Sequence, residues 1–72
     1  MEQTTLYIDV NKTWFTCRLT KKPAYVLERA TYNWIVKVFS DKGIDHKSFN
    51  VSDMDTLIEL GFKIVIVGTY ED

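Results

Sequence analysis

Four side chains in this chain belong to types that serve as catalytic groups or metal ligands, but their spacing argues against both uses. The only histidine, His46, and the only cysteine, Cys17, lie far apart in the sequence, whereas metal ligands usually recur at close spacing. Asp53 and Asp55 fall where a helix is expected to begin, and carboxylates at that end stabilise the helix dipole. We therefore expect no catalytic residue, no metal site and no cofactor, although a site shared between two subunits at His46 or Cys17 stays open.

Aromatic and basic side chains near the start of the chain are better suited to binding a macromolecule. Tyrosine, tryptophan and arginine dominate the hot spots of protein interfaces, and aromatic rings beside cations can also stack on nucleic-acid bases. The candidate partner-binding residues are Tyr7, Trp14, Arg18, Lys21, Lys22, Val65 and Val67. Three interpretations of the surface around Trp14 remain: a protein contact, a nucleic-acid contact, or a face buried beneath a helix with Trp14 in the core.

These residues must be positioned by two strands that the sequence predicts at 4–10 and 13–20. Both segments alternate between apolar and polar residues, which is typical of strands with one buried face. Asn11-Lys12 between them predicts a two-residue hairpin turn. Closing the hairpin there predicts a register in which apolar residues face each other, with Ile8 opposite Phe15 and Leu6 opposite Cys17.

A long helix is predicted next, over residues 24–42, although a strand over 32–39 is the alternative because β-branched and aromatic residues are frequent there. Polar residues recur at helical spacing within 29–40, and Gly43 followed by Ile44 is typical of a helix C-terminus. The periodicity and the glycine stop together favour the helix.

The remaining elements are predicted as a short edge strand or loop at 45–51, a short helix with Ser52 as its N-cap, and a last strand at 62–70. The glycine-plus-apolar pair that ends at Phe62 predicts the end of the short helix. The order is therefore ββαβαβ, or ββααβ if 45–51 is a loop. The predicted fold class is α+β, with both helices on one face of the sheet.

The last predicted strand is apolar on both faces. Ile64 and Ile66 lie on one side, and Val65 and Val67 on the other. A strand that is apolar on both faces must be covered on both sides, and two helices on one side cannot provide both covers. We therefore expect the second cover to come from a partner, which includes a second copy of the chain.

Composition and charge limit the classes of protein that are compatible with this chain. Its 72 residues are 46% hydrophobic and 14% aromatic and carry a net charge of −1, which indicates one folded domain over 1–72 rather than a disordered chain. Residues 1–40 contain six basic and three acidic side chains, whereas 41–72 contain three basic and seven acidic ones. A total so near zero argues against a dedicated nucleic-acid-binding protein.

Cysteine usage and hydropathy predict the compartment. A single cysteine excludes an intrachain disulfide, and the longest apolar run, Ile64–Val67, is far shorter than a membrane span. No signal-peptide pattern is visible near the start. We expect a cytoplasmic protein, in a cell or in an infected host, without a membrane partner.

Taken together, the sequence predicts a small non-catalytic interaction protein that binds and inhibits or regulates another protein. A phage or mobile element is its expected source, because short chains of this kind without a catalytic site are common there. The chain is also expected to form a homodimer through the outer face of the hairpin and sheet. The alternative function is nucleic-acid binding through the basic and aromatic hairpin face.

Overall fold

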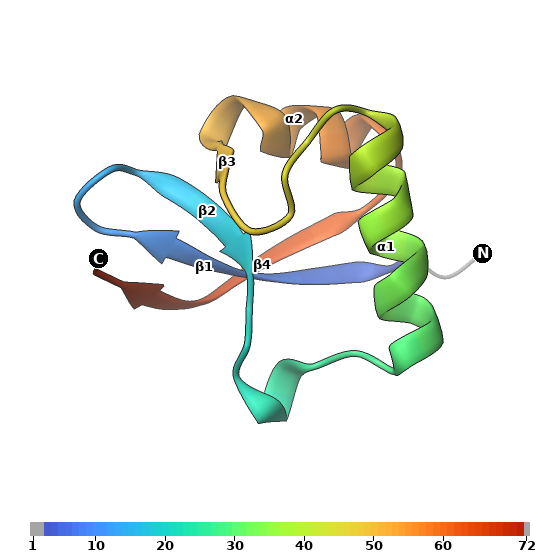
Figure 1. Ribbon diagram of the computed structural model, residues 1–72, viewed down its shortest axis with the longest axis horizontal. Helices are drawn as coiled ribbons and strands as arrows, with labels where there is room; N and C mark the ends of the chain where they lie inside the picture. Colours follow the sequence, from blue (N-terminus) through green and yellow to red (C-terminus); the bar gives the residue numbers. More distant parts are fainter. Residues whose placement is uncertain (1–2, 72) are drawn as a thin grey trace.

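The computed structural model describes residues 3–71 and shows a four-stranded mixed sheet with two α-helices (Figure 1). The sheet order is β3-β2-β1-β4, in which β1 is antiparallel to β2 and parallel to β4. The strands are β1 (Thr5–Asn11), β2 (Thr16–Leu19), β3 (Phe49–Asn50) and β4 (Lys63–Tyr70). The α+β class and the order ββαβαβ are confirmed, since the segment that could be strand or loop contains the two-residue strand β3.

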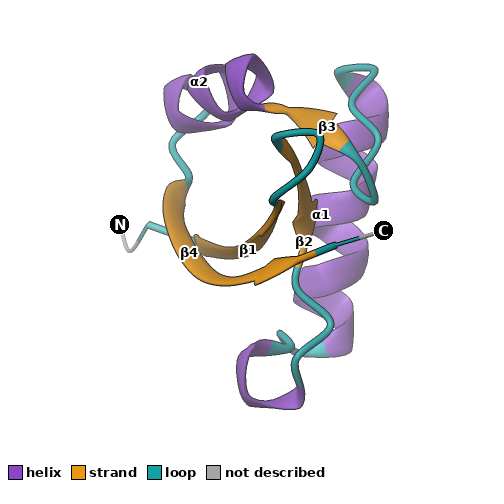
Figure 2. Cartoon of the chain, turned by 90° about the vertical axis from the view of Figure 1, so that its left-hand side faces the viewer, coloured by secondary structure: helices purple, strands orange, loops and turns teal. Residues whose placement is uncertain are grey.

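Both helices pack against one face of the sheet and close a single core. The helices are α1 (Arg29–Asp41) and α2 (Val51–Glu59). Ile35 and Phe39 from α1 and Leu57 from α2 are buried against the apolar residues that alternation predicted to point inward from β1 and β2: Leu6, Ile8, Cys17 and Leu19. Figure 2 shows the curved sheet with α2 above it and α1 beside it.

The predicted hairpin register is wrong, because the turn is longer than two residues. Ile8 pairs with Leu19 and Val10 with Cys17, so Phe15 lies in the turn instead of facing Ile8. The cause is local: the amide N–H of Phe15 donates to the carbonyl of Asn11 at 3.0 Å, which closes a loop over residues 12–14. The change in register is an even number of residues, so the inward residues of both strands stay inward.

The helix predicted over 24–42 begins later, at Arg29. Pro23–Tyr25 forms a separate 3₁₀ turn, and residues 26 and 28 are extended, which interrupts the helix. Leu27 between them packs against the core, so this short connection is held by burial. The alternative strand over 32–39 is excluded, and the predicted stop is confirmed: Gly43 has φ 71°, and the Ile44 N–H donates to the Phe39 carbonyl at 2.8 Å.

The second helix begins two residues earlier than predicted, because its N-cap is Asn50 and not Ser52. The Asn50 N–H donates to the Asp53 carboxylate at 3.2 Å, which is the reciprocal half of a capping box. Its predicted end is confirmed, since Gly61 has φ 101° and the Phe62 N–H donates to the Leu57 carbonyl at 3.1 Å. The last strand then begins at Lys63.

Candidate functional site

The turn between β1 and β2 presents two large aromatic side chains to solvent. Trp14 is 68% exposed and Phe15 is 72% exposed, the highest values among the large hydrophobic residues of the described chain. We call this pair the aromatic tip. It lies at the end of the hairpin farthest from α1 (Figure 1). Trp14 is therefore not a core residue.

The aromatic tip is held by the side chain of Asn11. This side chain is buried, and its Oδ1 accepts the N–H groups of Thr13 at 2.9 Å and Trp14 at 2.7 Å. Together with the Phe15–Asn11 backbone hydrogen bond, these contacts order the turn from both ends. An asparagine that bonds to the backbone ahead of it is a common way to build such turns.

Phe15 adopts a backbone conformation that is unfavourable for its residue type. Its φ is +54°, and among the described residues it is the only non-glycine residue with positive φ. A bulky side chain in this region costs about 1–2 kcal/mol relative to ordinary backbone. Strain of this kind is concentrated at functional sites, where a residue is retained for something other than stability.

This strain leads to a prediction about Phe15. Replacing Phe15 with glycine should raise the free energy of unfolding by about 0.5–1 kcal/mol, because relief of the strain exceeds the added entropy of the unfolded chain. Urea unfolding monitored by circular dichroism measures this change. Phe15→Ala is the control, since it removes the ring while keeping a side chain at positive φ, and it should not stabilise. A glycine variant less stable than the alanine variant would contradict the assignment of strain.

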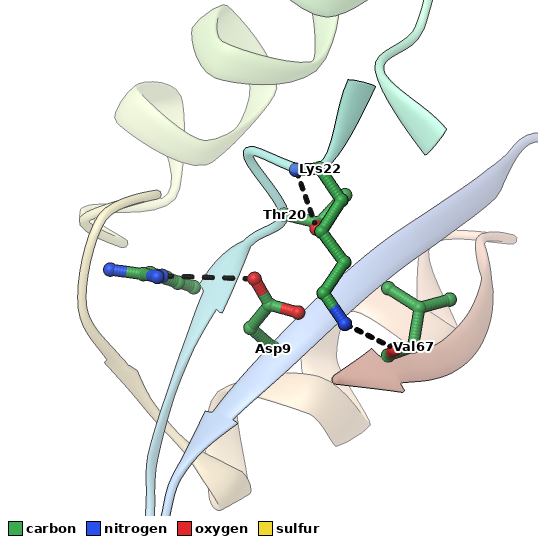
Figure 3. A network of polar contacts seen from close by, with 5 residues as sticks. Asp9, Thr20, Lys22 and Val67 are labelled. Carbon is green, nitrogen blue, oxygen red and sulfur yellow. Dashed lines mark hydrogen bonds and ion pairs between the residues drawn. The ribbon is translucent and has the colours of Figure 1, made fainter. Parts of the chain in front are cut away.

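The outer face of the sheet, opposite the helices, is partly covered by residues 20–26, which we call the strap. The Tyr7 ring of β1 packs against Tyr25 of the strap, with ring centroids 5.2 Å apart. The Lys22 Nζ donates to the carbonyl of Val67 in β4 at 3.0 Å, and the Lys22 N–H donates to the Thr20 hydroxyl at 3.1 Å (Figure 3). The strap therefore spans from β2 to β4 across β1.

A buried carboxylate lies beside the strap. Asp9 is almost completely buried, and its Oδ2 is 3.9 Å from the Nε of Arg18 on the neighbouring strand, an ion pair too long for a hydrogen bond (Figure 3). The Arg18 guanidinium also lies over the Tyr70 ring, 3.7 Å from its centroid. Gly68 opposite Asp9 leaves room for this arrangement, since a Cβ there would collide with the ends of Asp9 and Lys22.

The structure brings together only some of the predicted partner-binding residues. Tyr7, Arg18, Lys22 and Val65 share the outer face, and Val67 joins them through the hydrogen bond from Lys22 to its carbonyl. Trp14 lies at the turn, and the Asp9–Arg18 pair on β1 and β2 separates it from Tyr7. Lys21 is exposed on the strap. Strict alternation had placed Phe15 inward, so its exposure was missed; only Asn11, a residue that favours turns, indicated an irregular region there.

The chemically reactive side chains occupy separate structural positions. Cys17 is fully buried, and this burial raises the pKa of its thiol, which keeps it in the protonated form. His46 packs edge-on against Tyr32 with centroids 6.2 Å apart. Within residues 3–71, no group of three or more His, Cys, Asp or Glu side chains is arranged to hold a metal ion.

Comparison of the chain with protein-family models, curated proteins and solved structures finds no match in any of the three. Neither helix in the described part of the chain has the length and apolar character needed to cross a bilayer. The geometry of the aromatic tip and the outer face is therefore the evidence for function.

Proposed function

We propose that this chain is a non-catalytic binding protein that inhibits or regulates another protein, with Trp14 and Phe15 as the residues that enter the partner. The observation that carries the proposal is an exposed Trp-Phe pair on a turn ordered by Asn11. The other phenylalanines, Phe39, Phe49 and Phe62, are buried in the core. The tip is therefore where this chain departs from the usual burial of phenylalanine.

The energetics of binding favour a tip of this kind. Tryptophan and phenylalanine each bury about 150–250 Å² when they enter a pocket, and such anchors dominate the energy of many interfaces. Binding also costs entropy when flexible groups become ordered, and a turn that is already ordered reduces that cost. Inhibition would follow if the pocket that receives the tip is one that the partner needs for its own activity.

The other predicted partner-binding residues would lie at the rim of this interface. Lys21 is exposed on the strap, and Tyr7, Val65 and Val67 are half-buried. Rim residues exclude water from the anchors and contribute little energy individually. In this proposal the outer face supports a contact whose energy comes from the tip.

Nucleic-acid binding is less well supported, because two of the cations it requires have partners inside the protein. Arg18 is paired with Asp9 and lies over Tyr70, and the Lys22 ammonium donates to a backbone carbonyl. Cations held in this way are less available to phosphates. A binding affinity for single- or double-stranded oligonucleotides that falls steeply with salt would favour this alternative over a protein partner.

The chain contains a matched control for testing the tip. Trp34 on α1 is 50% exposed and belongs to a different surface, where its ring packs against Phe62. We expect Trp14→Ala to weaken binding to the partner by about 30-fold or more, since loss of a hot-spot anchor costs roughly 2 kcal/mol or more. Trp34→Ala should leave binding within about threefold of the wild type, the range of an energetically neutral surface change.

The measurement begins with capture from a nuclease-treated lysate on immobilised wild-type chain and on both tryptophan variants, followed by titration of the recovered protein. A protein retained by the wild type and by Trp34→Ala, but not by Trp14→Ala, would support the proposal. Equal retention by all three chains would show that the tip is not the binding element. Circular dichroism of each variant verifies that the fold is retained.

A further inference from the structure

β4 forms an open edge of the sheet. Within residues 3–71 it pairs only with β1, and its other side has no neighbouring strand. β4 is eight residues long, whereas β3 at the opposite edge has two residues. In Figure 2, β4 forms the left and lower border of the curved sheet. The long edge strand is therefore the place where another strand could be added.

Two hydrogen bonds identify which backbone groups of β4 face this open side. The Lys63 N–H donates to the Thr4 carbonyl at 2.9 Å, and the Lys12 N–H donates to the Tyr70 carbonyl at 3.0 Å. Residues 63 and 70 therefore both face β1, although strict alternation would place them on opposite edges. A bulge in β4 causes this departure from alternation. Ile66 pairs with Ile8 and Gly68 pairs with Asp9, so Val67 is an extra residue without a partner on β1. Before the bulge, Ile64 and Ile66 direct their N–H and C=O groups away from β1.

The side chains at this edge offer little protection against pairing. Ile64–Val67 is an unbroken run of β-branched aliphatic residues, and Lys63 is the only charged residue of β4. Ile66 is 49% exposed even though it lies on the same face as buried Ile8. Natural proteins usually protect such an edge with several charges or a proline, because an apolar edge recruits other strands. A strand with this composition is expected to be covered.

We propose that the open edge of β4 pairs with β4 of a second copy of this chain, antiparallel and with Val65 at the two-fold axis. Ile64 of one copy then lies opposite Ile66 of the other, twice by symmetry, and each such pair exchanges both of its backbone hydrogen bonds. A second copy fits because the two outward-facing residues are symmetric about Val65, so the same strand supplies the complementary groups. This inference goes beyond the proposed binding function and does not depend on it.

The same register also satisfies the side chains. On the helix side of the sheet, Ile64 of the second copy covers the exposed side chain of Ile66, because directly opposite residues share a face. The two Lys63 side chains lie toward opposite ends of the paired segment, so they do not repel each other across the axis. The bulge at Val67 ends the pairing and prevents continuation along the rest of β4.

The register is tested by disulfide cross-linking. Residue 65 faces β1, so across the axis it forms a non-hydrogen-bonded pair whose Cα atoms are about 4.5 Å apart, within the range that a disulfide spans. Val65→Cys with oxidised glutathione should give mostly covalent dimer, whereas Val67→Cys, which is off the axis, should stay mostly monomeric. Cys17 is fully buried and does not interfere. Cross-linking of Val65→Cys no faster than that of Val67→Cys would overturn the register.

The association itself is tested by sedimentation of the full chain from about 10 µM to about 1 mM, the range in which weak self-association is measured. The mean mass should rise from 8.4 kDa toward twice that value. Ile66→Lys should weaken association by about tenfold or more, because it places a charge beside the apolar strand pair. Val26→Lys changes a residue of similar exposure, 55%, on the strap and should not alter association.

A monomeric mass over the whole range, or association unchanged by Ile66→Lys, would overturn the proposal. Loss of association in Trp14→Ala would also overturn it, because that result would place the contact at the aromatic tip. Retention of the dimer in Trp14→Ala supports it and keeps the test separate from that of the proposed function. The cross-linking variants keep the proposal testable if Ile66→Lys does not fold.

Discussion

Replacing Phe39 with alanine should lower the free energy of unfolding by about 3–5 kcal/mol, the usual cost of removing a buried phenylalanine. Phe39 is fully buried on α1, and its ring meets Phe49 of β3 edge-on with centroids 5.6 Å apart. The main-chain carbonyl of Phe39 also accepts the Ile44 N–H that ends the helix, and the variant keeps this bond. The variant therefore loses burial and an aromatic contact at the same time.

The size of this effect matters because the chain is short. A domain of 72 residues has a total stability of roughly 4–11 kcal/mol, so this single change would remove a large part of it. Urea unfolding measures the difference. Trp34→Ala on the same helix removes a half-exposed ring and should cost less than about 2 kcal/mol. Equal losses for the two variants would show that Phe39 does not have the central role in the core assigned to it.

Replacing Asn11 with alanine should affect both stability and binding. The side chain accepts two backbone N–H groups in the turn and is itself buried, so its loss should cost about 2 kcal/mol of unfolding free energy. The turn would also become less ordered, and Trp14 and Phe15 would no longer be held for binding. In the proposed function, affinity for the partner should then fall by about tenfold or more, although neither aromatic ring is altered.

Asn11→Asp is the matched control, because a carboxylate oxygen can accept the same two N–H groups. It should retain more of the partner affinity than Asn11→Ala. Urea unfolding measures the loss of stability, and titration with the captured partner measures the loss of affinity. An alanine variant that binds as tightly as the wild type would show that order in the turn does not contribute to recognition.

Much of the fold could be predicted because it depends on local rules. Alternation identified the inward faces of β1 and β2, with Leu6, Ile8, Cys17 and Leu19 in the core. Gly43 and Gly61 marked the ends of the two helices, because each adopts the positive φ that such stops require. These features depend only on residues close in sequence, because the alternation of side chains along a strand and the conformation of a glycine are both local properties.

The predictions failed where residues compete for the same role. Two potential caps, Asn50 and Ser52, lie two residues apart, and the contact with Asp53 selects Asn50. The predicted helix starts at residue 24, whereas α1 starts at Arg29, after an extended connection in which Leu27 packs against the core. Neither choice could be made without knowing where the core lies.

The candidate site shows the same division. The order of residues is enough to show that aromatic and basic side chains cluster in the hairpin and that the last strand is apolar on both faces. The folded chain was needed to show that Phe15 joins Trp14 at an exposed tip, that Arg18 and Lys22 have internal partners, and that β4 is an open edge. The physical reason is that exposure, ion pairing and strand order depend on which distant segments meet. A period of two residues specifies the face on which a side chain lies but not what covers that face.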